Sequence, residues 1–129
     1  MPDSTPARQS GACDIVHTQH YLRARVGPGL ANEVQECYRA LAGACLQGGC
    51  RRVLVLGLSR VDSFYHLALR DALRSIALAG VPDDFRLAVV ALTPDLIAVY
   101  DAAVLEAQRL GLEARRFMSE QDAEGWLMT

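Results

Sequence analysis

Two continuous apolar runs constrain the fold of this chain more than any other feature. The first spans Val53–Leu58 and the second spans Leu87–Leu92. Short runs rich in Val and Leu, without a polar residue at every second position, are typical of strands that are covered on both faces, as in parallel sheets. Both runs are far too short to cross a bilayer. They predict two buried central strands, the second of which begins at Phe85.

Segments with helical periodicity lie around these runs. Before the first run, apolar residues recur at helical spacing from Leu30 to Cys45, and Gly48-Gly49 ends the pattern. A second helix lies between the runs and ends at Gly80. Its buried stripe is predicted to contain Leu69, Leu73, Ile76 and Ala77.

A third helix follows the second run. It begins at Thr93-Pro94-Asp95, with Thr as the N-cap and Pro at the first helical position. The inward-facing residues are predicted to be Ile97, Tyr100, Val104, Ala107 and Leu110. Strands that alternate with helices in this way form parallel pairs joined by right-handed crossovers.

Shorter elements complete the domain at both ends. Asp14–Thr18 and His20–Val26 predict an antiparallel hairpin, because apolar residues alternate with polar ones in the second segment. Glu113–Met118 is a last strand, and Ser119 caps a short helix that ends in Trp126-Leu127. Residues 1–13 contain Pro, Ser and Gly and are predicted to form a flexible tail.

These patterns predict a single α/β domain over residues 14–129. Its sheet is mixed but mostly parallel, and about four helices cover it. A length of 129 residues fits one domain, and the apolar content of 51% supplies a core without a disulfide or a metal.

Composition excludes several functions. All 13 basic residues are Arg, so Schiff-base lysines and P-loop lysines are ruled out. The net charge of −2 argues against a nucleic-acid partner. A dinucleotide site needs a Gly-rich turn after the first buried strand, and only Gly57 is present there. We therefore expect no cofactor.

We expect no metal site, no membrane span and a cytoplasmic location. His17 and His20 are three residues apart, which in a continuous strand would send their rings to opposite faces. The N-terminal segment lacks the apolar region of a signal peptide. Without such a signal the four cysteines, at positions 13, 37, 45 and 50, are expected to be reduced thiols.

Candidate nucleophiles and bases cluster after the first buried strand. Ser59, Asp62, Ser63 and His66 lie within eight residues, at the sheet end where open α/β folds place their ligands. However, the nucleophile elbow G-x-S-x-G is absent. Asp62 or Ser63 is better explained as the N-cap of the second helix. We therefore expect a non-enzymatic protein, and a hydrolase is the less favoured hypothesis.

The order of elements resembles the SpoIIAA-like proteins, which are relatives of STAS domains. The resemblance covers about residues 14–128 and includes a C-terminal pattern of Phe117, Ala123, Trp126 and Leu127. In STAS anti-sigma-factor antagonists, an Asp-Ser-Ser-Gly turn follows the central strand, and its second Ser is phosphorylated. The corresponding turn here is Asp62-Ser63-Phe64-Tyr65, with Phe64 at the position of the phosphorylated Ser. Ser63 is then the possible phosphorylation site.

The resemblance implies a regulatory or binding module that contacts a protein partner and can form a homodimer. The contact surface would be the turn and the second helix. The alternative is a carrier or sensor of a small apolar, lipid-like ligand, because the architecture is also similar to CRAL-TRIO lipid-binding domains. The candidate partner or ligand residues are Asp62, Ser63, Phe64, Tyr65, His66, Leu67, Leu69 and Tyr100.

Overall fold

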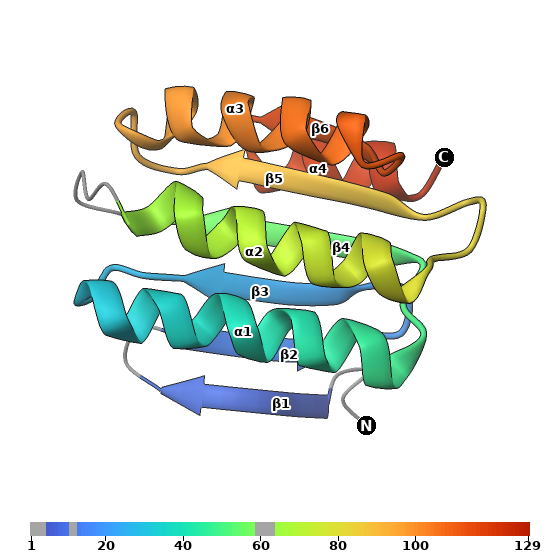
Figure 1. The fold of residues 1–129 in the computed structure, drawn as a ribbon, viewed down its shortest axis with the longest axis horizontal. Helices are drawn as coiled ribbons and strands as arrows, with labels where there is room; N and C mark the ends of the chain where they lie inside the picture. Colours follow the sequence, from blue (N-terminus) through green and yellow to red (C-terminus); the bar gives the residue numbers. More distant parts are fainter. Residues whose placement is uncertain (1–4, 11–12, 59–63) are drawn as a thin grey trace.

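The computed structural model describes residues 5–10, 13–58 and 64–129, with side chains for 13–58 and 67–129. Six strands form one sheet in the order of the sequence (Figure 1). They are β1 (Thr5–Ser10), β2 (Cys13–His17), β3 (Leu22–Val26), β4 (Arg52–Gly57), β5 (Arg86–Ala91) and β6 (Glu113–Phe117). The helices are α1 (Ala31–Gly48), α2 (Phe64–Ala79), α3 (Leu96–Arg109) and α4 (Glu120–Leu127).

The sheet is mixed and mostly parallel, and the predicted α/β fold class is confirmed. β1, β2 and β3 pair antiparallel, whereas the pairs from β3 to β6 are all parallel. Each parallel strand lies beside the one before it, so right-handed crossovers that all progress in one direction place their helices on one face. Accordingly α1, α2 and α3 lie side by side on one face and α4 lies on the other (Figure 1).

The apolar runs are buried on both faces, as predicted. In β4, Val53 and Val55 pack against the three-helix layer, whereas Leu54 and Leu56 belong to the smaller core beneath α4. Side chains alternate between the faces of a strand, so cover on both sides requires apolar residues at consecutive positions. This explains why the runs lack polar alternation.

Three predictions for individual elements were wrong. Thr5–Ser10, expected in a flexible tail, forms the edge strand β1, with a register shift between Pro6 and Arg8. Proline is tolerated at such an edge, and propensity did not reveal the pairing. Cys13 likewise begins β2. In α3 the prediction was wrong in part: Tyr100 and Ala107 are buried as predicted, but Leu96 and Ala103 are the other buried residues, and Ile97, Val104 and Leu110 are only partly buried.

Helix α4 is held onto the sheet by arginines. Arg52 Nε donates to the Leu127 carbonyl at 2.8 Å, and Arg86 donates to the Trp126 carbonyl at 2.7 Å. These donors satisfy carbonyls at the negative end of the helix. At the other end, the Ser119 hydroxyl caps the helix by accepting from the Asp122 amide at 3.2 Å, as predicted.

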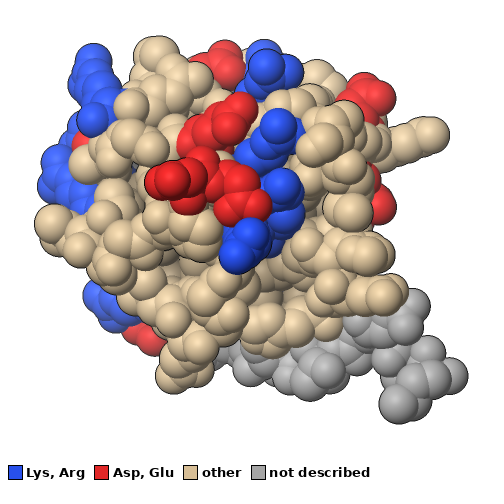
Figure 2. Space-filling view, turned by 90° about the vertical axis from the view of Figure 1, so that its right-hand side faces the viewer, with Lys and Arg blue, Asp and Glu red and all other residues tan. Residues whose placement is uncertain are grey.

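The end of the molecule where the parallel strands begin is charged. A cluster of acidic side chains lies directly beside a row of basic ones there, with uncharged surface around both (Figure 2). Its ion pairs include Arg51 with Asp84 at 3.1 Å and Arg86 with Glu113 at 3.9 Å. Exposed pairs of this kind contribute little to stability. They do neutralise much of the arginine charge at this end.

Candidate functional site

In the sequence, the predicted contact turn falls between the end of β4 and the start of α2, and both of these lie at the carboxyl edge of the parallel strands (Figure 1). Asp62 and Ser63 fall outside the described residues, as does Ser59. Phe64, Tyr65 and His66 form the first turn of α2, and their side chains are not described. The turn is therefore bracketed by Leu58 and by the start of α2. This is the edge where open α/β sheets bind their ligands.

Two other candidate residues lie in the core. Leu69 is 1% exposed and Tyr100 is completely buried, both within the cluster beneath α1, α2 and α3. The Tyr100 hydroxyl hydrogen-bonds with the Tyr38 hydroxyl at 2.9 Å. In this conformation neither Leu69 nor Tyr100 offers surface to a protein partner, and both residues act in packing.

Tyr100 also packs against the end of β4. A Cβ atom added at Gly57 would lie 2.0 Å from the Tyr100 hydroxyl oxygen and 2.8 Å from Leu96 Cδ1. Only a residue without a side chain leaves room for this ring. The glycine that sequence analysis examined for nucleotide binding thus serves packing, and the tyrosine ring fills the space above the strand end.

Large apolar side chains are exposed along the same edge. Leu92 directly follows β5 and is 41% exposed, and Met118 directly follows β6 and is 55% exposed. Leu30, in the loop after β3, is 69% exposed. Leu67 adds a half-exposed side chain from the second turn of α2. Sequence analysis missed the first three because each resembles the end of an adjacent buried stripe.

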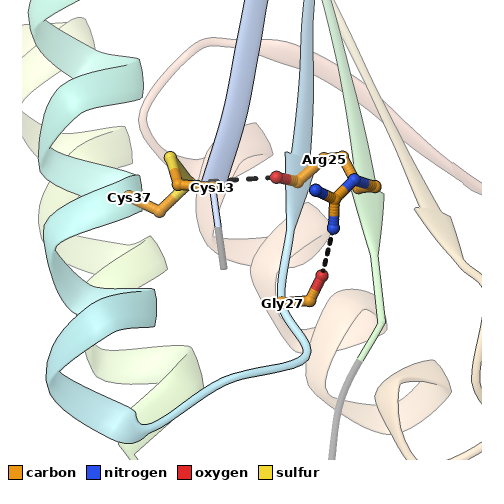
Figure 3. Close-up of a disulfide and its surroundings, with 4 residues drawn as sticks. All are labelled: Cys13, Arg25, Gly27 and Cys37. Atoms are coloured by element: carbon orange, nitrogen blue, oxygen red, sulfur yellow. Dashed lines mark hydrogen bonds between the residues drawn. A yellow bond between two sulfur atoms is a disulfide. The ribbon is translucent and has the colours of Figure 1, made fainter. Parts of the chain in front are cut away.

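One pair of cysteines is joined. Cys13 of β2 and Cys37 of α1 form a disulfide with a Cα–Cα distance of 5.3 Å (Figure 3). Cys37 Sγ also lies 4.0 Å from the Arg25 carbonyl oxygen. The expectation of four reduced thiols was wrong for this pair. The two cysteines are 24 residues apart, and only the packing of α1 over β2 brings them together.

The other two cysteines, Cys45 and Cys50, are free thiols at the opposite end of α1. Their side chains hydrogen-bond to each other, and the bond from Cys45 lowers the pKa of Cys50 to about 7. The same bond, with burial, raises the pKa of Cys45. Cys45 is buried and Cys50 is partly exposed.

Cys50 borders an open hollow of about 210 Å³ at the end of the molecule that Figure 2 faces. His17, His20, Arg51 and Arg52 also line it. The expectation that the two histidine rings point to opposite faces was wrong, because β2 ends at His17 and His20 lies in the following bend. Strand alternation does not apply across that bend.

The described ranges contain neither a metal-binding cluster nor a membrane-spanning helix. Residues 5–10, 13–58 and 64–129 contain no group of three or more His, Cys, Asp or Glu side chains placed to hold a metal ion. None of the helices in this part of the chain is long and apolar enough to span a membrane.

Comparison with known proteins identifies no relative. No protein-family model, curated protein or solved structure matches the chain. The assignment of a function therefore rests on the residues and their geometry.

Proposed function

We propose that this chain is a non-enzymatic, STAS-like regulatory or binding module that contacts a protein partner. The sequential strand order, with three helices on one face and a short C-terminal helix on the other, supports the proposed resemblance. The contact surface is the carboxyl edge of the parallel strands, together with the start of α2.

The observation that carries this proposal is the exposed apolar edge. Leu92 and Met118 follow adjacent parallel strands, and Leu30 lies at the same edge of the sheet. Helix α2 begins at the same edge, at Phe64. Exposed apolar groups of this size lose contact with water when a protein partner covers them, which favours binding.

The packing favours a protein partner over an enclosed apolar ligand. A carrier needs an apolar cavity of roughly 300 Å³ or more. Between the helices and the sheet, the space over β4 is occupied by Tyr38 and Tyr100, which hydrogen-bond to each other. Four hollows lined by described residues measure about 160 to 300 Å³, and all of them, including the one of about 300 Å³ beside Leu30, are open to solvent and do not enclose a ligand.

A site-specific photo-crosslinking experiment tests the proposed surface. A photoreactive amino acid replaces Met118 in one variant and Leu105 in a matched control. Leu105 is exposed to the same degree, at 57%, but lies on the outer face of α3. We expect a discrete protein adduct in native lysate from position 118 and none from position 105. Equal labelling from both positions, or none from either, contradicts the proposal.

Two further measurements separate the related possibilities. Native mass spectrometry of freshly purified protein reports a carried apolar molecule and a homodimer in one spectrum. A bound lipid-like mass would favour the carrier alternative. Incubation with lysate and ATP, followed by phosphosite mapping, tests Ser63 as the phosphorylation site. An unmodified Ser63 would rule out that switch.

The cytoplasm is the proposed compartment, and the disulfide makes this testable. Cytosolic reductants keep most protein thiols reduced. The Cys13–Cys37 pair should therefore be reduced in cells and oxidised only after isolation or during stress. Alkylation of acid-quenched cells measures this directly. A fully oxidised pair in unstressed cells would argue against the cytoplasm.

A further inference from the structure

The geometry points to a second functional site at the C-terminus of α1, where Cys45 and Cys50 form a dithiol pair that exchanges with low-molecular-weight disulfides. We propose that Cys50 is the attacking thiol and Cys45 the resolving thiol. This site is at the opposite end of α1 from the carboxyl edge and does not depend on the proposed partner surface.

The helix cap brings the two sulfur atoms together. Gly49 has a left-handed conformation with φ of 60°, and the Cys50 amide donates to the Cys45 carbonyl at 3.3 Å. This six-to-one hydrogen bond closes a Schellman motif, in which the side chains at these two positions are frequently in contact.

The two thiols differ in access, as an exchange reaction requires. Cys50 borders the open hollow, whereas Cys45 is 3% exposed and lies beneath the cap. A disulfide in solution can therefore reach Cys50 but not Cys45. The resulting mixed disulfide at Cys50 would still be in contact with the Cys45 thiol.

The surroundings of Cys50 favour its thiolate form. Cys45 from α1 donates the hydrogen bond that lowers the pKa of Cys50 to about 7, which favours the thiolate at neutral pH. His17 from β2 approaches the same space, because a Cβ atom added at Gly48 would lie 3.4 Å from both Cys50 Sγ and His17 Cε1.

The charged side chains that line the hollow are Arg51 and Arg52, and His20 and Tyr21 line it as well. Asp84 lies 3.1 Å from Arg51 and 3.8 Å from Arg52. The acidic side chain is paired with the arginines, and it does not line the hollow that Cys50 borders. Oxidised glutathione, a small soluble disulfide, is the probe for this open hollow.

The reaction has two balanced steps. The Cys50 thiolate attacks one sulfur of oxidised glutathione, the glutathione S–S bond breaks, and one glutathione thiolate leaves and takes a proton from water. The Cys45 sulfur then attacks Cys50 Sγ, and the Cys45 proton passes to the sulfur of the departing glutathione. The second glutathione leaves, and the Cys45–Cys50 disulfide remains. The dithiol loses two electrons, which reduce oxidised glutathione to two molecules of glutathione.

Intact-mass analysis with oxidised glutathione tests the order of attack. The native chain should lose two hydrogens, and peptide mapping should find Cys45 linked to Cys50. Cys45→Ala should stop at a mixed disulfide on Cys50, and Cys50→Ala should not react. A native chain that keeps a stable mixed disulfide, or a Cys50→Ala variant that reacts at the native rate, would overturn the proposal. The mapping of the native chain needs no variant and so decides the question even if one fails to fold.

The pH dependence of alkylation provides an independent measurement. The rate at Cys50 should rise with pH through a midpoint near 7 in the native chain. In Cys45→Ala the midpoint should move toward the ordinary thiol value of about 8.5, which lowers the rate at pH 7 roughly tenfold. Circular dichroism confirms that the variant is folded. An unchanged midpoint would show that Cys45 does not activate Cys50.

Discussion

Reduction of the Cys13–Cys37 disulfide should destabilise the fold by an amount that follows from its position. The bond joins β2 to α1 across a sequence separation of 24 residues. In the chain-entropy treatment, a loop of this length restricts the unfolded chain enough to stabilise the native state by about 3.5 kcal/mol at 25 °C. Both cysteines are almost fully buried, so the reduced thiols would remain as small core side chains.

The assay is urea unfolding of the Cys45→Ala/Cys50→Ala variant with and without reductant. This background leaves only the Cys13–Cys37 pair, so any response to reductant reports that bond. For a slope of about 1.5 kcal/mol per molar urea, the midpoint should fall by roughly 2 M. In a thermal scan the same change lowers the Tm by roughly 10–13 °C.

If reduction lowers the free energy of unfolding by less than about 1 kcal/mol, the chain-entropy explanation is refuted, because loop closure over this sequence separation should contribute more than that. Thiol titration of the unreduced, denatured native chain gives a separate check. It should find the two free cysteines, Cys45 and Cys50, and not four.

Three further predictions concern packing, capping and titration. Gly57→Ala forces a methyl group against the Tyr100 ring and should cost about 3 kcal/mol or more by urea unfolding. The control Gly43→Ala has open space in α1 and should instead stabilise by about 1 kcal/mol, and similar effects at both sites would contradict the contact. Ser119→Ala removes the N-cap of α4 and should lower the free energy of unfolding by about 1 kcal/mol, whereas Ser119→Asp should keep most of the stability that the cap provides. Burial raises the pKa of Tyr21 from 10 to about 12, so its contribution to stability should hold below pH 10 and be lost from pH 10 to 12. Tyr21→Phe should flatten that part of the stability profile, and an unchanged slope would refute the assignment.

The central elements were predictable because burial and periodicity agree there. β4 and β5 are covered on both faces, so each must be continuously apolar, and no helix of that length would bury every position. The stop of α1 at Gly48-Gly49 was equally visible, because Gly49 takes the left-handed conformation that ends the helix.

The errors arose where a contact between distant residues decides the outcome. β1 is a strand because it pairs with the free edge of β2, although Pro6 lowers the strand propensity of this segment. In α3 the apolar residues form a broad face, and the packing of Tyr100 against Gly57 selects Leu96 over Ile97 as the buried position. Periodicity alone does not distinguish two neighbouring stripes.

The pairing of the cysteines could not be predicted from helical periodicity either. It also shows that the two cysteines of α1 have different roles. Cys37 and Cys45 are eight residues apart on the buried stripe of α1, which predicted core positions and gave no information on partners. Cys37 bonds to a separate element and closes a long loop, so opening that bond frees the chain between β2 and α1. Cys45 and Cys50 lie within one helix cap that backbone hydrogen bonds already order, and a loop this short contributes only about 2 kcal/mol in the same treatment. The first pair therefore stabilises the fold, whereas the second can change its oxidation state while the fold persists.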